Sequence, residues 1–261
     1  MAIVNEKGEL IVLPPLTGSY SDNVAILDKI FRVDANFDLI KKPLKVGKDE
    51  VTLYYVDGFI KDTVMMKLMM SFLALNGVTG PASQFCATAL PYVETEVIQD
   101  TATLVQMVLS GAAVMLGSSF GAQAIVIDAR TYPARDTTEP EGDKVMRGAR
   151  DGFVETLIFN TALIRRRIRN PALTMSYVTV GSSSKTDIAI CYMEDRADKD
   201  LVDRVKSKLK AVQTDALAMG HESLAEVLIK KRWYNPFPKI RYTERPDTAA
   251  AQLMEGSVLV I

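Results

Sequence analysis

The stretch from Glu139 to Leu173 decides the fold, and it reads EPEGDKVMRGARDGFVETLIFNTALIRRRIRNPAL. An acidic, proline-punctuated approach leads through Arg147, Arg150 and Asp151 into a helical pattern with apolar residues on nearly every face. Because charge is confined to the two ends of this pattern, we expect a helix over residues 153–168 that is buried among other elements. Asp151 precedes it, where an aspartate can cap a helix.

On either side of this stretch the chain repeats one plan. Each copy contains a helix, two strands joined at a glycine turn, and a second helix. In the first copy these elements are expected at 21–31, 37–46, 51–55 and 62–75, and in the second at 153–168, 172–180, 187–192 and 200–212. Tyr55-Val56-Asp57 aligns with Tyr192-Met193-Glu194. The chain is therefore predicted to hold two similar subdomains.

The two copies also agree further along. Asp100 and Asp247 each start a predicted helix that ends at a glycine and opens a strand, as aspartate and glycine do at helix ends. The first copy continues into a return strand over residues 124–128, whereas the second stops before its equivalent. We therefore expect Ile261 to be a cut inside a hairpin.

Alternating strand and helix patterns predict an α/β class, with α+β as the alternative: mixed sheets covered by helices, in two subdomains joined by a linker. Prolines, a glycine and interspersed charges break all periodicity between Arg130 and Asp151. The expected divisions are a leader over 1–20, a first subdomain over 21–129, a linker over 130–151 and a second subdomain over 152–261.

Composition excludes several classes of protein. The 261 residues carry 31 basic and 32 acidic side chains, so no general field attracts nucleic acid, and we expect no nucleic-acid partner. Cys86 and Cys191 lack metal-ligand spacing, and no metal site or cofactor is expected. The N-terminus lacks a secretory signal, and the longest apolar run, residues 64–75, is too short to cross a bilayer.

Motifs for catalysis are weak. Residues 181–186 end in Lys-Thr like a phosphate-binding loop, but Ser184 replaces the required glycine and the segment lies between two strands, so a polar hairpin turn is expected. Ser182 and Lys185 match a Ser-x-x-Lys spacing without its helix. His221 is the only histidine, so no triad can be assembled around a spare base. We expect no enzyme.

Two segments differ from an ordinary solvent-exposed helix: an arginine cluster and an apolar helix. Arg165, Arg166, Arg167 and Arg169 end the predicted central helix; they offset its dipole, and they could also pair with linker acids, a neighbouring subunit or phosphate head groups. The helix at 62–75 has no polar face, unlike its counterpart at 200–212. Either its own domain buries it, or one face that includes Met66 or Met70 is exposed and forms an oligomer interface. We predict the second.

A family resemblance rests on the order of several motifs. The central stretch supplies an acidic residue before proline, an Arg-Gly step, Asp-Gly-Phe-x-Glu, an asparagine and an Arg-rich helix end. Later motifs are Val180-Gly181, Lys185-Thr186-Asp187, Phe237-Pro238 and Thr243-Glu244-Arg245-Pro246-Asp247. In this order they resemble the GerA-type spore germinant-receptor A-subunit family, with Ala149 where that family usually has proline. Residues 55–62, YVDGFIKD, resemble the stage V sporulation protein AF branch most.

The resemblance implies the soluble region of a membrane protein of the spore inner membrane, on the cytoplasmic, spore-core side. Such a protein would form a homo-oligomer, act with other spore germination membrane proteins, be anchored by C-terminal spans, and take part in germinant-triggered ion movement as an ion channel. This region would be its sensing or assembly module. Two lobes could alternatively form a small-molecule-binding module with a cleft between them. Candidate residues for ligand binding or interdomain coupling are Arg147, Arg150, Asp151, Glu155, Asn160, Arg165, Arg166, Arg167 and Arg169.

Overall fold

The computed structural model describes residues 12–78, 80–90, 92, 94–131, 149, 151–212, 224–225, 228 and 239–261. The chain divides into two compact units. The first comprises residues 1–134 together with 168–171, and the second comprises residues 135–167 and 172–261. Each unit has its own sheet and is described by itself.

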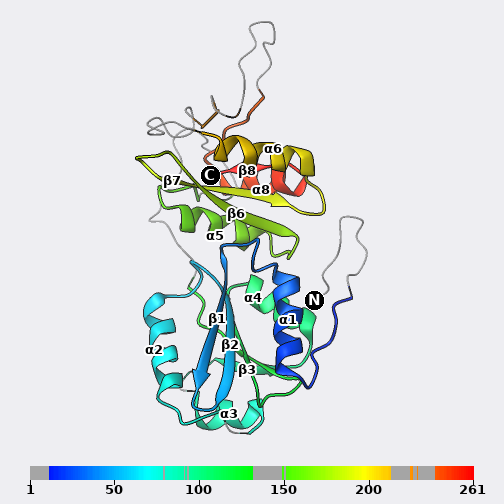
Figure 1. Cartoon of the computed structure of the whole chain (residues 1–261), viewed down its shortest axis with the longest axis vertical. Helices are drawn as coiled ribbons and strands as arrows, with labels where there is room; N and C mark the ends of the chain where they lie inside the picture. Colours follow the sequence, from blue (N-terminus) through cyan, green and yellow to red (C-terminus); the bar gives the residue numbers. More distant parts are fainter. Residues whose placement is uncertain are drawn as a thin grey trace, which may run out of the picture. The chain divides into compact units, whose positions relative to one another are not determined.

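The first unit contains a five-stranded sheet, of which Figure 1 labels β1, β2 and β3. The strand order is β1-β2-β4-β5-β3, and all neighbouring strands are antiparallel. Its elements are α1 (Tyr20–Phe31), β1 (Leu39–Val46), β2 (Asp49–Val56), α2 (Asp62–Leu73), α3 (Ala82–Thr88), β3 (Thr95–Ile98), α4 (Thr101–Leu109), β4 (Ala113–Gly117) and β5 (Ala124–Ile127).

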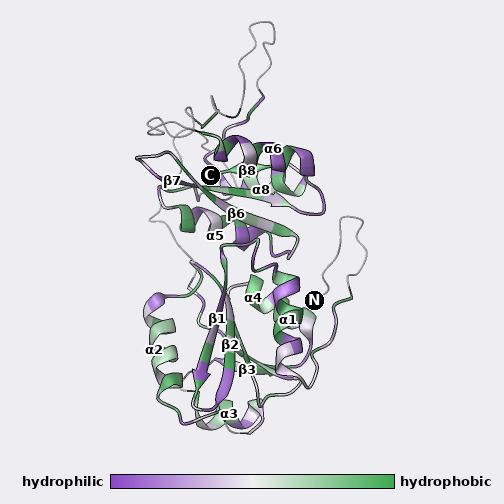
Figure 2. Ribbon diagram, in the orientation of Figure 1, coloured by the Kyte–Doolittle hydropathy of each residue, from purple (hydrophilic) through white to green (hydrophobic). Residues whose placement is uncertain are grey.

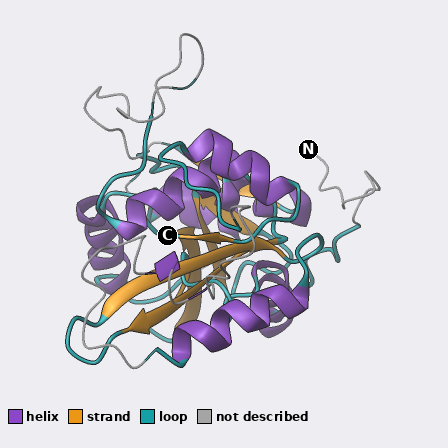
Figure 3. Ribbon diagram, turned by 90° about the horizontal axis from the view of Figure 1, so that it is seen from above, coloured by secondary structure: helices purple, strands orange, loops and turns teal. Residues whose placement is uncertain are grey.

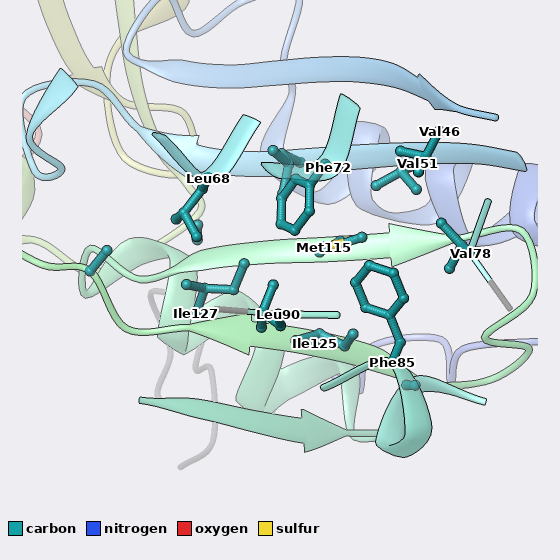
Figure 4. Packing of buried hydrophobic residues seen from close by; sticks show 14 of the residues in the cluster. Val46, Val51, Leu68, Phe72, Val78, Phe85, Leu90, Met115, Ile125 and Ile127 are labelled. Carbon is teal, nitrogen blue, oxygen red and sulfur yellow. The ribbon is translucent and has the colours of Figure 1, made fainter. Parts of the chain in front are cut away.

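The core of this unit lies where α2 and α3 cover one face of the sheet. Phe72 of α2 and Phe85 of α3 point toward Met115 and Ile125 on the central strands (Figure 4). The centroids of the two phenylalanine rings are 6.2 Å apart, within the range of favourable aromatic contacts. Strand side chains alternate between faces, so the residues that point the other way meet α1 and α4 instead.

The second unit is built on a three-stranded antiparallel sheet in the order β6-β7-β8. Its elements are α5 (Leu157–Arg167), β6 (Leu173–Val180), β7 (Thr186–Met193), α6 (Lys199–Lys210), α8 (Pro246–Met254) and β8 (Leu259–Val260). Val202 and Leu209 of α6 pack on the face of the sheet that carries Ile188 and Ile190. Seen from above, helices flank the strands of the sheets (Figure 3).

Local sequence explains several element ends. Ser19 caps α1, Asp100 caps α4 and Asp198 caps α6, each through a side-chain oxygen that accepts a backbone N–H of the first turn. Gly47 adopts φ +60° in the turn between β1 and β2, and a Cβ there would lie 2.0 Å from the carbonyl oxygen of Asn76. Only glycine fits that turn.

The duplicated plan is confirmed. α1 and α5 begin the same number of residues before Tyr55 and Tyr192, and β2 and β7 are each followed by a helix that packs on the same side of its sheet. β4 pairs with β2 as β8 pairs with β7. The expected combination of helices and sheets is also confirmed, while every strand pair of the described residues is antiparallel, where mixed sheets were expected.

Several expectations need correction. The central helix begins at Leu157, four residues later than expected, and Asp151 does not cap it. Asp247 lies inside α8, whose N-cap is Arg245. The short elements α3 and β3 were not anticipated, because neither has enough residues for a clear periodic pattern. Residues 181–185 form the expected turn between β6 and β7, whereas His221 lies outside the described residues.

Candidate functional site in the second unit

The segment before α5 has no regular secondary structure, and the helix itself holds it in place. The side chain of Asn160 accepts a hydrogen bond from the backbone N–H of Val154 at 2.8 Å and donates one to the carbonyl of Val154 at 2.6 Å. Asn160 is buried. Because its amide satisfies both polar groups of Val154, that residue does not need helical hydrogen bonds, and the helix starts later than the apolar pattern suggests.

Asp151 pairs with the far end of the same helix. Nη2 of Arg167 lies 2.6 Å and 2.5 Å from the two carboxylate oxygens of Asp151, and Nη1 of Arg167 donates to the carbonyl of Leu163 at 3.0 Å. Arg167 thus satisfies a carbonyl of the last turn and binds the acid that leads into the helix. Both side chains are about a quarter exposed.

The motif at the start of α8 meets the same segment. Arg245 forms a two-pronged ion pair with Asp247 and donates from Nη2 to the carbonyl of Ala149 at 3.2 Å. The N–H of Phe153 donates to the carbonyl of Glu244 at 2.9 Å. Residues about 90 positions apart in the sequence therefore hold one short segment from two sides.

The two ion pairs form one electrostatic cluster, which we call the signature cluster: Asp151, Arg167, Arg245 and Asp247. Hydrogen bonds from the Arg245 side chain lower the pKa of Asp247 below its usual value, and the charges of Arg245 and Arg167 add to this effect. Two guanidinium groups face two carboxylates, so the charges balance within the cluster. Such an arrangement of paired guanidinium and carboxylate groups fixes local geometry.

The other candidate residues lie in different environments. Arg165 is fully buried and donates from Nη1 to the carbonyl of Leu173 at 3.2 Å. Glu155, Arg166 and Arg169 are exposed. Arg147 and Arg150 lie outside the described residues, so the structure shows nothing of their expected role. Within the described part of the chain, no group of three or more His, Cys, Asp or Glu side chains could hold a metal ion.

Arg245 and Asp247 were missed as site residues. Their motif was recognised, but nothing local shows that Arg245, at 7% exposure, points back toward Ala149. The order of the family motifs was the only available signal, because residues that share a family pattern often share a site.

The helix α2 supplies a second candidate, an exposed apolar surface. Met65, Leu68 and Phe72 are buried, whereas Met66 and Met70 are 55% and 63% exposed. Figure 2 shows the contrast with the second unit: α2 is hydrophobic along most of its length, and α6 carries strongly hydrophilic residues. The expected exposure of one α2 face is observed; that another subunit covers it stays a prediction.

Comparisons with known proteins agree with one another. A family model described as Bacillus/Clostridium GerA spore germination protein matches residues 25–261. Stage V sporulation protein AF of Bacillus subtilis (strain 168) is 38% identical over 231 residues, covering 87% of this chain and 46% of that protein. Spore germination protein B1 of the same strain is 28% identical over 241 residues, covering 87% and 49%. The chain spans about half the length of these relatives.

A solved structure has the same fold. It is the N-terminal domain of the A subunit of the Bacillus megaterium spore germinant receptor GerK3, with a TM-score of 0.68 and 20% sequence identity, and the match covers 96% of this chain and 93% of that one. At this identity the likeness concerns the fold alone. None of the helices that the structure describes combines the length and apolar character that crossing a bilayer requires.

Proposed function

Because the chain belongs to the Bacillus/Clostridium GerA spore germination protein family, we propose that it is the soluble, cytosolic-side domain of a spore germination membrane protein that takes part in germinant-triggered ion movement. The observation that carries this proposal is the family match over residues 25–261, together with 38% identity to stage V sporulation protein AF. The whole protein would lie in the spore inner membrane and act with other germination proteins.

The domain acts in this proposal as a non-enzymatic sensing and assembly module. The signature cluster and the neighbouring backbone hydrogen bonds support a mechanical role, since they hold Ala149, Asp151 and Phe153 against α5 and the start of α8. Arg165 holds the carbonyl of Leu173 at the start of β6, so the same helix is also anchored to the sheet. A change sensed at one end of α5 would then be transmitted to the segment that enters the second unit. Arg147 and Arg150 would extend this coupling.

A germination assay tests the proposal. Spores that carry the full-length protein are compared with two variants. Arg167→Gln breaks the ion pair with Asp151, and Arg169→Gln removes an exposed charge two residues beyond the end of α5. We expect slower release of monovalent cations after germinant addition for Arg167→Gln only, at equal protein level in the membrane. Equal release from spores that lack the protein altogether would overturn the proposed role.

A further inference from the structure

The duplication serves as an internal reference for what each unit exposes. α2 and α6 are equivalent helices and bury equivalent positions, since Met65 and Phe72 correspond to Val202 and Leu209. Their outer faces differ. The exposed positions of α2 that we call the α2 face are Met66, Met70 and Leu73, and their equivalents on α6 are Asp203, Ser207 and Lys210. An apolar surface has therefore replaced a hydrophilic one in the first unit only.

In the second unit, exposed aromatic side chains stand where the first unit has none. Phe159 of α5 is 45% exposed and Tyr177 of β6 is 51% exposed. Their equivalents in the first unit are Asp22, the third residue of α1, and Pro43, the fifth residue of β1, both exposed. Two exposed aromatic side chains of the second unit therefore stand where the first unit has an aspartate and a proline. We call these two residues the α5-side aromatics.

These aromatics lie away from α6. Val178 and Val180 belong to the cluster beneath α6, and strand side chains alternate, so Tyr177 points to the opposite face of the sheet. Figure 1 shows α5 on that opposite side of β6 and β7. The first unit thus exposes an apolar face on α2, and the second unit exposes aromatic side chains on the side of its sheet that does not carry the equivalent helix α6.

We propose that the α2 face of one copy of this chain binds the α5-side aromatics of a second copy. This inference rests on the proposed role in assembly and identifies the two surfaces that make the contact between copies. Methionine side chains adapt to their partner and make favourable contacts with aromatic rings. Methionine and aromatic residues are also the types that protein interfaces concentrate, while acidic residues and lysine are depleted there.

Charged residues near the two surfaces have opposite signs, which favours this contact. Lys67 is exposed on α2 between Met66 and Met70. Beside Tyr177, the hydroxyl of Thr179 donates to Oδ1 of Asp187 at 3.0 Å, and Asp187 is exposed. A lysine at the edge of one surface and an aspartate at the edge of the other allow an ion pair across the contact.

The size of the surfaces decides between two ways of pairing copies. With two or three large side chains each, neither surface alone provides the roughly 20–30 residues per partner that a stable interface contains. If α2 of one copy bound α2 of a second copy, each copy would bury only its α2 face, and the α5-side aromatics would stay exposed to water. A contact between unlike surfaces lets each copy make two contacts, so that copies follow one another head to tail and can close into a ring.

Cysteine cross-linking in the full chain tests the proposal. The two native thiols are first removed by Cys86→Ser and Cys191→Ala. Two differently tagged copies are then expressed together, one with Met70→Cys and the other with Tyr177→Cys, and membranes are treated with a bifunctional maleimide. We expect a product that carries both tags, at least tenfold above either single-cysteine copy alone. The matched control pairs the equivalent positions, Ser207→Cys with Asp22→Cys, and should give no such product.

A charge exchange gives a second measurement that does not depend on cysteine. Lys67→Glu alone should lower the cross-linking yield several-fold, and Lys67→Glu combined with Asp187→Lys should restore it. Efficient cross-linking of Met70→Cys copies to one another would overturn the proposal in favour of α2 pairing, and a product with a different protein would overturn it in favour of that partner. If spores still release cations but give no product with both tags, these two surfaces do not form the contact. The proposed function is unaffected by that result.

Discussion

Asn160 and Val154 form a two-way hydrogen bond between a buried amide and a backbone residue six positions earlier. The first unit contains the same device, since Asn23 accepts from the N–H of Thr17 at 2.6 Å and donates to its carbonyl at 2.9 Å. Each asparagine is the fourth residue of the first helix of its unit. The two units therefore share the hydrogen bonds that hold the chain just before the first helix, as well as the order of their elements.

Replacing Asn160 by alanine should lower the free energy of unfolding by about 1–3 kcal/mol, because Val154 loses both of its partners in a partly buried site. Asn160→Asp should recover little, since a carboxylate cannot donate to the carbonyl of Val154. Urea unfolding measures both, with the exposed Glu155→Gln as control. Equal stability of Asn160→Ala and the wild type would contradict this account.

The ion pair between Asp151 and Arg167 should show coupling in a double-mutant cycle. With Asp151→Asn and Arg167→Gln, the double variant should be about 1–2 kcal/mol more stable than additivity predicts, since both charged partners are partly buried and share two short contacts. Arg167→Lys should not restore the pair, because the guanidinium binds both a carboxylate and a carbonyl. Additive effects would mean that the pair contributes nothing to stability.

Acid should weaken the signature cluster. Hydrogen bonds from Arg245 lower the pKa of Asp247 in the folded chain, so its contribution is present above the unfolded value of about 3.9 and is lost as the pH falls through the folded pKa. The difference in melting midpoint between wild type and Asp247→Asn should be constant from pH 7 to pH 5 and shrink below about pH 4. A difference that persists undiminished in acid would exclude an ionic contribution.

Two nearby positions on α2 should differ in how much they contribute to stability. Phe72 is fully buried against Phe85, so Phe72→Ala should cost about 3–5 kcal/mol of unfolding free energy. Met70 is 63% exposed, so Met70→Ser should change it by less than about 0.5 kcal/mol. Thermal unfolding distinguishes them. A large loss for Met70→Ser would show that the domain itself buries this side chain.

Features with a local cause could be predicted. The helix α1 and the strands β1 and β2 follow from apolar periodicity, and the cap at Asp100 follows from hydrogen bonds between neighbours in the sequence. The alignment of Tyr55 with Tyr192 predicted the duplication, because equivalent patterns recur at equal spacing. The family motifs were equally local, and their order sufficed to indicate the family.

The candidate site could be predicted only in part. Asp151, Asn160 and Arg167 were predicted as site residues, but as members of a set for ligand binding or interdomain coupling that also included Arg147 and Arg150. Their contacts with each other and with the backbone of Val154 were not foreseen. A charged side chain in a sequence has many possible partners, and burial and distance select among them.

The sequence by itself determined the periodic elements, the repeated plan and the family, since each depends on residues close together along the chain. Only the tertiary structure decided where α5 begins, because the buried amide of Asn160 competes with the helix for the backbone of Val154. It also brought Arg245 to Ala149 and left Met66 and Met70 exposed while burying Met65. Such outcomes depend on packing between residues far apart in sequence, which no local pattern encodes.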